Sequence, residues 1–375
     1  TNAAEVVTAT ATKSAGPARS SGTLEVLAHY AIASRQGLIV AVGPEEAVRD
    51  ATALVPGGTE VDAGGRAVIP GFVDPHTHAV FGRPRPEEYA ARIEGRTYKE
   101  IAAAGGGIHS SVRDLRARSE EELLQLSLTR LRRMLQHGTT TVEIKTGYGL
   151  NLEDELKTLR VIHRLRELLP MKIVATFLAA HEIPLELRSN RRKYVEQVIE
   201  EFLPQAAPLA DFNDVFCEPS VFTKEETTQI LRAGQELGLP AKLHADELDS
   251  YGAAELACEL GAVSADHLIK VSDAGIAALA GSATVAVLLP ATSFGLALNE
   301  YAPARKLLEA GATVALATDF NPGSSHCPSM QAAWSLACSL MRVTPAEGLV
   351  SCTQNAAMAV GCGAEVGSLE PGKRC

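Results

Sequence analysis

A repeated alternation of short β-rich runs with longer amphipathic segments occupies most of the chain and restricts the folds open to it. Eight runs have the length and the β-branched composition of strands, and they cover residues Ala67–Val73, Thr139–Lys145, Lys172–Ala179, Phe212–Cys217, Ala241–His244, Ala262–Asp266, Thr284–Leu289 and Thr313–Ala317. Helical periodicity is clear in four of the intervening segments, namely Glu120–Gln136, Glu153–Leu169, Asn190–Phe202 and Lys224–Leu237. Eight strand–helix repeats predict a parallel α/β fold, either a (β/α)₈ barrel or an open, doubly wound sheet.

Polar residues at the C-terminal ends of the expected strands distinguish these two folds. Five of the 10 histidines stand at or just after strand ends, namely His76, His78, His181, His244 and His267. Asp319 follows the eighth strand. In a barrel all strand ends meet on one face, where active sites are built, whereas in an open sheet the first and last strand ends lie far apart. The pattern therefore favours a TIM-like (β/α)₈ barrel.

The region before the first barrel strand has a different pattern. Residues 24–43, with the sequence LEVLAHYAIASRQGLIVAVG, are predicted to form two strands joined by a turn at Arg35-Gln36-Gly37. Such a hairpin is marginally stable alone, so we expect it to pack in a small β-sandwich-like domain beside the barrel. The predicted division is a small β domain at residues 1–66, a barrel at residues 67–345, and a C-terminal helical segment at residues 346–375 that returns toward the β domain.

The composition excludes several classes of partner. The 375 residues carry a net charge of −10, so a basic surface for nucleic acid is not expected. No apolar stretch approaches the roughly 20 residues that a membrane-spanning helix needs, and the N-terminus lacks the apolar core of a signal peptide. The seven cysteines are odd in number and form no C-x-x-C pair, which is typical of reduced thiols in a cytoplasmic protein.

Six short motifs stand at the ends of the expected strands. They read VIPGFVDPHTH (68–78), HTHAVFGRPRPEEY (76–89), KTGYGL (145–150), AAHEIP (179–184), LHADEL (243–248) and ATDFNPGSSHCPSM (317–330). Together they resemble the amidohydrolase superfamily of metal-dependent hydrolases, and within it the imidazolonepropionases. The resemblance extends from about Gly71 to Leu369. Members of that family continue with strands that complete the small β domain, so the resemblance also implies that this chain is shortened at its C-terminus.

The resemblance implies a reaction and a cofactor. Family members hydrolyse the ring amide of 4-imidazolone-5-propanoate to N-formimidoyl-L-glutamate, in histidine degradation, by means of a metal-activated water. The implied metal ligands are His76, His78, His244 and Asp319. Three imidazoles and one carboxylate suit Zn²⁺ or iron (Fe²⁺ or Fe³⁺) better than Mg²⁺. The fourth strand ends at Cys217-Glu218, without the lysine that bridges two metals in binuclear relatives. We therefore expect one metal per chain, with a bridging Glu218 as the alternative.

The same resemblance assigns roles to other side chains. In the catalytic set, Asp319 takes a proton from the attacking water, Glu247 passes one to the departing ring nitrogen, and His267 polarises the carbonyl or orients the nucleophile. The expected substrate contacts are Arg85, Tyr148, His181, Glu247, Asn321, Gly323 and Ser324. Arg85 is chosen over its neighbour Arg83 to clamp the propionate carboxylate. The plainer interpretations are a solvated carboxylate at Glu247 and an ordinary turn at N-P-G-S-S.

Two rival functions use the same scaffold. An aromatic deaminase, acting for example on cytosine or guanine, needs the same ligand set, but Arg85 and the N-P-G-S-S turn favour a substrate that carries a carboxylate. A non-catalytic relative that serves in assembly or binding is disfavoured, because all four metal ligands are present. The expected partner is the small-molecule substrate, with no nucleic acid and no membrane. A homodimer is left open.

Overall fold

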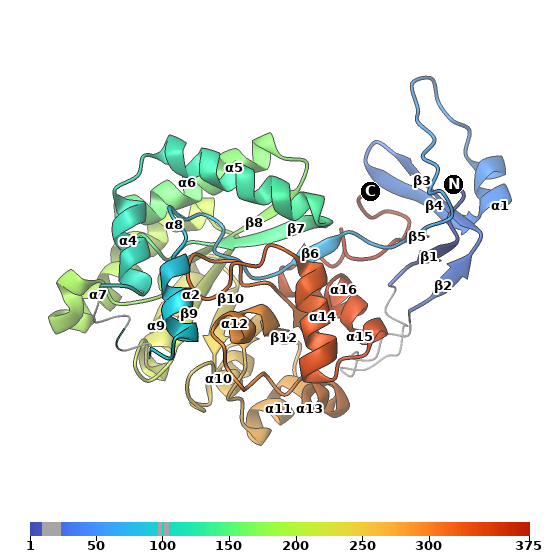
Figure 1. Ribbon diagram of the computed structural model, residues 1–375. Coiled ribbons are helices and arrows are strands. Elements are labelled where there is room, and N and C mark those ends of the chain that lie inside the picture. Colours follow the sequence, from blue (N-terminus) through green and yellow to red (C-terminus); the bar gives the residue numbers. More distant parts are fainter. Residues whose placement is uncertain (10–23, 97–99, 101–104) are drawn as a thin grey trace.

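The computed structural model describes residues 1–9, 24–96, 100 and 105–375, so residues 10–23 of the expected small domain lie outside the described residues. Within the described ranges, eight parallel strands form one sheet in sequential order. Helices cover the outer face of this sheet, and a small β domain lies to one side (Figure 1). The strands are β6 (Phe72–Asp74), β7 (Thr139–Lys145), β8 (Lys172–Ala180), β9 (Phe212–Cys217), β10 (Ala241–Ala245), β11 (Ser264–His267), β12 (Val285–Leu288) and β13 (Val314–Leu316).

The first and last strands of this sheet meet just beyond their C-terminal ends. Thr77, after β6, and Phe320, after β13, form a parallel bridge. The backbone N–H of His78 donates to the Phe320 carbonyl at 2.9 Å, and that of Asp319 donates to the His76 carbonyl at 3.0 Å. The sheet therefore closes at the end that carries the histidines. This closure confirms the predicted (β/α)₈ barrel.

The strand expected at Ala67–Val73 is in fact two strands. β5 (Ala67–Val68) pairs with the small domain, and only β6 joins the barrel. Pro70 and Gly71 separate them. Proline has no N–H for a ladder hydrogen bond. A Cβ on Gly71 would lie 2.2 Å from Oγ1 of Thr140, so only glycine fits this close approach to β7.

Two of the outer helices begin with capping boxes. Ser119 and Glu122 form a capping box before α5, and Thr223 and Glu226 form another before α9. The helical segments are α1 (Glu45–Ala51), α2 (Pro86–Ile93), α4 (Ile108–Arg116), α5 (Glu120–Gln136), α6 (Leu152–Leu168), η1 (Leu185–Asn190), α7 (Arg191–Gln197), η2 (Val198–Phe202), α8 (Leu203–Ala206), η3 (Ala207–Leu209), α9 (Lys224–Glu236), α10 (Ala253–Glu259), α11 (Asp273–Ala280), α12 (Pro290–Gly295), α13 (Ala304–Ala310), α14 (Met330–Met341), α15 (Pro345–Ser351) and α16 (Gln354–Ala359).

The helix expected at Asn190–Phe202 is not uniform. Asn190 is the N-cap of α7, because its side chain accepts the N–H of Lys193 at 3.3 Å. After Gln197 the backbone widens into the π-helical segment η2. Pro204 follows within the next turn and has no N–H to donate. We therefore attribute the irregularity to Pro204, which the hydrophobic periodicity of the segment does not take into account.

The small domain is built from short strands of the N-terminal part of the chain, and the C-terminal residues join it. β2 (Val26–Ala28), β1 (Glu5–Val7) and β5 form one sheet, and β3 (Tyr30–Arg35) pairs with β4 (Leu38–Pro44). Gln36 and Gly37 both have positive φ, 53° and 77°, so the predicted hairpin turn is confirmed. The N–H of Ile39 donates to the Lys373 carbonyl at 2.8 Å. The C-terminal end thus lies against β4, and both termini lie at this domain (Figure 1).

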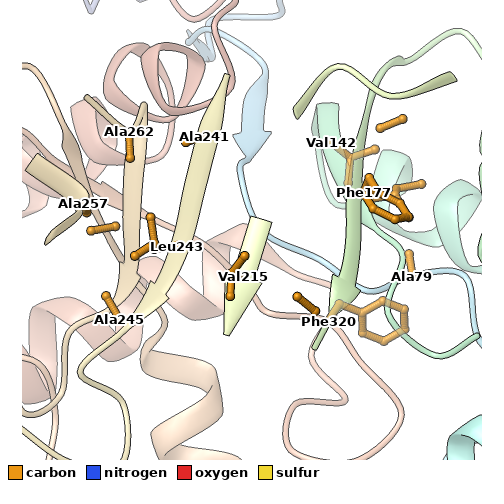
Figure 2. Close-up of a cluster of buried hydrophobic side chains, with 14 of the residues drawn as sticks. Ala79, Val142, Phe177, Val215, Ala241, Leu243, Ala245, Ala257, Ala262 and Phe320 are labelled. Atoms are coloured by element: carbon orange, nitrogen blue, oxygen red, sulfur yellow. The ribbon is translucent and has the colours of Figure 1, made fainter. Parts of the chain in front are cut away.

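Side chains alternate between two faces of the barrel strands. Val142, Val215 and Leu243 belong to the apolar cluster between strands and helices (Figure 2). The positions beside them are charged, with Glu143 on β7 and Lys242 on β10 joined by an ion pair inside the barrel. Because successive residues of a strand face opposite sides, the same strands supply the packed outer layer and a polar interior. That interior supports the site at the strand ends.

Candidate active site

Three buried histidines meet at the C-terminal ends of the strands. His76 and His78 follow β6 and His244 lies in β10, and one ring nitrogen of each lies within 4.8 Å of the others. Asp319, after β13, places its Oδ1 3.7 Å from Nε2 of His76 and 3.7 Å from Nε2 of His78. The structure thus brings together the four residues that the sequence singled out as ligands. Their binding of a metal stays a prediction.

Two of these imidazoles each contact a buried carboxylate on the side away from the cluster. Nδ1 of His76 lies 2.6 Å from Oδ2 of Asp266, and Nδ1 of His244 lies 3.2 Å from Oδ1 of Asp214. Each carboxylate accepts the Nδ1 proton and leaves the lone pair on Nε2. Nε2 of His76 and Nε2 of His244 are buried without a hydrogen-bond partner among the described residues. Burial lowers the pKa of His76 and of His78 well below the ordinary value, so both rings are neutral. This donor set fits a transition metal.

A buried ion network joins those two carboxylates. Nζ of Lys145 lies 2.7 Å from Asp214 and 3.4 Å from Asp266. Glu143 lies 3.2 Å from Lys145 and 2.9 Å from Lys242. Although burial opposes it, the three carboxylates raise the pKa of Lys145 above its ordinary value and keep it charged. This network was not predicted from the sequence. Its signal was available as charged residues inside otherwise apolar strands, which are costly unless paired.

Glu247 and His267 face the histidine cluster from the neighbouring strand ends. The ring of His267 has its centroid 5.3 Å from that of His76 and 5.2 Å from that of His244. Its Nδ1 lies 3.5 Å from Oε1 of Glu247, whose side chain is 13% exposed. Burial, and then the nearby carboxylate of Asp319, raise the pKa of Glu247 well above its ordinary value. A carboxyl group that can exchange a proton therefore stands beside the cluster.

Asp319 is held at the seam between the first and last strands. Its Oδ2 accepts the hydroxyl of Thr292 at 2.6 Å, and burial raises its pKa to about 6. Its φ is +50°, a left-handed conformation that is uncommon outside glycine. The preceding Thr318 donates its hydroxyl to Asp74 at 2.6 Å. These contacts over-determine a strained backbone, as occurs at functional sites.

Two aromatic side chains flank His78. The ring of His181 stacks on that of His78 with centroids 4.8 Å apart and an angle of 11°. Nδ1 of His181 lies 3.1 Å from the carbonyl of Gly147, and Tyr148 packs 5.6 Å from His78. Burial raises the pKa of Tyr148, so its hydroxyl keeps its proton and remains a donor. Both predicted substrate residues therefore stand beside the cluster, although their contact with a substrate stays a prediction.

Arg85 packs against the turn that follows Asp319. Its backbone N–H donates to the Pro322 carbonyl at 2.7 Å, and its side chain, 11% exposed, lies 3.0 Å from Glu88 and bonds the hydroxyl of Ser111. A Cβ on Gly323 would lie 1.8 Å from the Arg85 guanidinium. In contrast, Arg83 is 58% exposed. The arginine preferred from the sequence is therefore the one that lies at the turn.

The turn itself is fixed by hydrogen bonds within it and by a second arginine. Oδ1 of Asn321 accepts the N–H groups of Gly323 and Ser324, both at 2.8 Å, and its amide donates to the Ser324 hydroxyl at 2.7 Å. Arg92 donates to the Gly323 carbonyl at 2.7 Å. Arg92 was not predicted, and its position seven residues after Arg85 on α2 gave no motif to find it by. Asn321 thus shapes the turn that carries Gly323 and Ser324.

Glu218 was the alternative bridge between two metals. Its Oε1 accepts the N–H groups of Glu247 at 2.7 Å and Leu248 at 2.9 Å, and its Oε2 accepts that of Asp249 at 3.3 Å. A carboxylate with both oxygens engaged by backbone donors is poorly placed to bridge ions. This contact set favours the expectation of one metal per chain.

Comparison with known proteins agrees with this geometry. The model of the Amidohydrolase family matches residues 67–375. The imidazolonepropionase of Symbiobacterium thermophilum is 52% identical over 346 residues, which cover 92% of this chain and 81% of that protein. The imidazolonepropionase of Geobacillus kaustophilus is 48% identical over 94% of this chain and 83% of that protein. The chain belongs to the imidazolonepropionase family.

A solved structure extends the comparison to the fold. An adenosine deaminase from Xanthomonas campestris, crystallised with bound zinc, superposes with a TM-score of 0.69 at 21% identity, over 100% of this chain and 82% of that one. At this identity the likeness concerns the fold alone. Membership of the imidazolonepropionase family makes the chain a hydrolase, and the histidine cluster indicates a metal ion. No helix among the described residues is long and apolar enough to cross a membrane.

Proposed function

We propose that this chain hydrolyses the ring amide of 4-imidazolone-5-propanoate and releases N-formimidoyl-L-glutamate, a step in histidine degradation. The observation that carries the proposal is a buried histidine cluster on the same barrel face as a buried arginine, Arg85. The cluster suits metal-assisted hydrolysis, and the guanidinium suits a substrate with a carboxylate. The imidazolonepropionases at 52% and 48% identity support the same substrate.

We propose that one zinc or iron ion (Fe²⁺ or Fe³⁺) per chain is held by His76, His78, His244 and Asp319. When bound, such an ion lowers the pKa of a water and polarises a carbonyl. The chain prepares the ligands for it. Asp266 holds the ring of His76 and so fixes which nitrogen is free to bind.

The proton transfers are assigned to three side chains around the cluster. In the proposed reaction a water adds to the ring carbonyl carbon and the ring C–N bond breaks. Asp319 takes a proton from that water, and Glu247 delivers a proton to the departing ring nitrogen. His267, which lies 3.5 Å from Glu247, polarises the carbonyl oxygen or orients the nucleophile. General acid–base transfer of this kind typically contributes about 10²–10⁴ in rate.

The substrate is anchored at its propionate end. Arg85 forms two hydrogen bonds with the carboxylate, assisted by the hydroxyl of Ser324 at the adjacent turn. Gly323 contributes by having no side chain, which leaves room for the guanidinium. Tyr148 and His181 line the ring. Asn321 contributes through the turn that it holds together. Binding energy from this non-reacting tail then orients the ring amide among the catalytic side chains.

The experiment is a product assay with purified protein. We expect N-formimidoyl-L-glutamate from 4-imidazolone-5-propanoate, with no release of ammonia, because ring opening by hydrolysis only adds a water. The runner-up is an aromatic deaminase of the cytosine or guanine type, supported only at the level of the fold. Ammonia from a panel of nucleobases, without turnover of the imidazolone, would establish that rival instead.

The remaining assignments are also proposals. We propose the predicted division at residues 1–66, 67–345 and 346–375, with the small β domain extended to Val68 by the pairing of β5 with β1. The last segment returns to that domain, which is supported by the hydrogen bond from Ile39 to Lys373. A cytoplasmic location is supported by seven free cysteines. Light scattering on purified protein decides between a monomer and a homodimer.

A further inference from the structure

Glu218 makes a set of charge-assisted hydrogen bonds to the segment that carries one of the catalytic side chains. It follows β9, is fully buried, and accepts three successive backbone N–H groups, those of Glu247, Leu248 and Asp249, at 2.7, 2.9 and 3.3 Å. Hydrogen bonds to an ionised acceptor are about twice as strong as neutral ones. The segment that carries Glu247 is therefore fastened to the end of the neighbouring strand.

Glu218 is itself held in a tight turn. Its N–H donates to the Phe222 carbonyl and its carbonyl accepts the N–H of Val221, both at 3.0 Å. Cys217 and Phe222 form a parallel bridge on either side of that turn. The Glu218 carboxylate therefore projects from a backbone that the barrel holds in place. The segment whose N–H groups it binds is held in place in turn.

The far end of the Glu247 segment has a second carboxylate anchor. Asp246, in a left-handed conformation with φ of +49°, accepts the N–H groups of Tyr251, Gly252, Ala253 and Ala254. The Glu247 carboxylate lies 3.5 Å from Nδ1 of His267, which is longer than a good hydrogen bond. The direction of the Glu247 side chain thus depends on its backbone, which these two anchors hold.

We propose that Glu218 is the positioning residue for Glu247: by binding the N–H groups of residues 247–249 it aims the Glu247 carboxylate at the reacting amide. The proposal rests on the proposed function, in which Glu247 transfers the proton. Displacement of a catalytic group by about 1 Å can cost about 10² in rate. The Glu218 carboxylate, which touches no reacting atom, therefore affects turnover by setting the position of the Glu247 carboxylate.

Glu155 offers a matched control, because it holds a different site segment in the same way. It is fully buried and accepts the N–H groups of Gly147, Gly149 and Leu150 at 3.1, 2.8 and 2.9 Å. The segment it holds carries Tyr148, a proposed substrate contact with no part in proton transfer. Loss of the contacts of Glu155 is thus expected to raise KM, whereas loss of the contacts of Glu218 is expected to lower kcat.

The first test is Glu218→Gln in the full chain with its metal. The amide keeps one acceptor oxygen but turns an NH₂ donor toward the remaining N–H groups, so the segment shifts. We expect kcat to fall about 10–100-fold, with KM within about 3-fold and metal content unchanged, whereas Glu155→Gln raises KM more than it lowers kcat. Equal effects of both variants on kcat and KM would mean support of loops in general and would overturn the proposal.

The decisive test is a double-mutant cycle with Glu247→Gln. If Glu218 acts through Glu247, Glu218→Gln lowers kcat by less than about 2-fold in the Glu247→Gln background, because coupled residues are not additive. The same fall in both backgrounds overturns the positioning role. If Glu218→Gln fails to fold, Glu218→Asp, which keeps the charge but shortens the reach, enters the same cycle.

The cycle also separates this proposal from the proposed function. A Glu247→Gln variant with unchanged kcat overturns the proton transfer by Glu247 and, with it, the role of Glu218. A collapse of kcat in Glu247→Gln alongside an unaffected Glu218→Gln variant overturns the positioning role alone and leaves the proposed function standing.

Discussion

Lys145 is the residue on which the two carboxylates behind the histidines depend. It lies 2.7 Å from Asp214 and 3.4 Å from Asp266, and all three side chains are fully buried. Lys145→Met leaves these carboxylates without their shared cation. We expect a loss of about 3–5 kcal/mol in the free energy of unfolding and about a 10–100-fold loss in metal affinity. Denaturant unfolding and metal titration against a competing chelator measure the two effects.

The control for this variant is Lys306→Met. Lys306 pairs with Asp273 at 3.5 Å, and its side chain is 68% exposed. Exposed ion pairs contribute little to stability, so both measurements should stay close to those of the parent protein. If Lys145→Met behaves like this control, the network does not organise the site.

A comparison of variants at Arg85 and Arg83 distinguishes a role in substrate binding from a general effect of surface charge. Arg85→Met removes the proposed partner of a desolvated carboxylate and should cost about 2–4 kcal/mol in kcat/KM. Arg83→Met should change kcat/KM far less, because Arg83 is 58% exposed and pairs with Glu87. Steady-state kinetics of both variants with the imidazolone substrate provide the comparison. Reversed effects would show that the tail binds at the rim of the site.

The candidate site residues could be chosen from the sequence because each stands in a motif at a strand end. His76, His78, His244 and Asp319 were found in this way. The side chains behind them were not, because their partners lie on other strands. Lys145 and Asp214 are 69 positions apart, and an ion pair across that separation cannot be predicted from one sequence. A charged residue within an apolar strand shows in the sequence where a buried ion pair begins. Its partner becomes known only from how the strands pair in the structure.

At the level of elements, the turn at residues 321–324 and helix α2 are built against each other. The Arg85 guanidinium lies where a Cβ of residue 323 would be, at 1.8 Å. Gly323→Ala must therefore displace Arg85, the turn, or both. We expect KM to rise at least 10-fold, because propionate binding is lost, and overpacking to cost about 1–3 kcal/mol of stability. Kinetics and thermal unfolding test this, and unchanged KM would place the tail elsewhere.

Element boundaries followed from the sequence where one period held throughout. Thr139–Lys145, Phe212–Cys217 and Glu120–Gln136 have the predicted bounds. The two larger errors occurred where proline interrupts the backbone, whereas the strand predicted at Ala262–Asp266 is shifted to Ser264–His267. Pro70 separates β5 from β6, and Pro204 follows the widened turn of η2. Periodicity describes side chains, whereas these breaks arise from a missing backbone donor.

At the scale of the whole molecule, the proposed metal site joins distant parts of the barrel. Its ligands come from the segment after the first barrel strand, from β10, and from the segment after the last strand. A metal that binds only the folded state stabilises it, by about 4 kcal/mol at 1,000 times the dissociation constant. We expect chelation to lower the melting temperature and to abolish activity, and added zinc or iron to restore both.

Elemental analysis belongs to the same experiment. One metal per chain is the expected result. Two per chain would revive Glu218 as a bridging ligand, against its present contacts with three backbone N–H groups. Full activity of the metal-free protein would contradict the proposed role of the metal, because the neutral imidazoles of the cluster would then hold no ion that the reaction needs.

The bridge between Thr77 and Phe320 also orders events in time. Asp74 and Thr318, which meet at this seam, are 244 positions apart, and contacts of such separation form late. On the ribosome, a chain that has emerged only as far as β12 already displays His76, His78 and His244 but lacks Asp319. We expect nascent chains arrested before Asp319 to bind metal weakly and turn over no substrate. Competence is then acquired in a single late step, when the final strand emerges and docks.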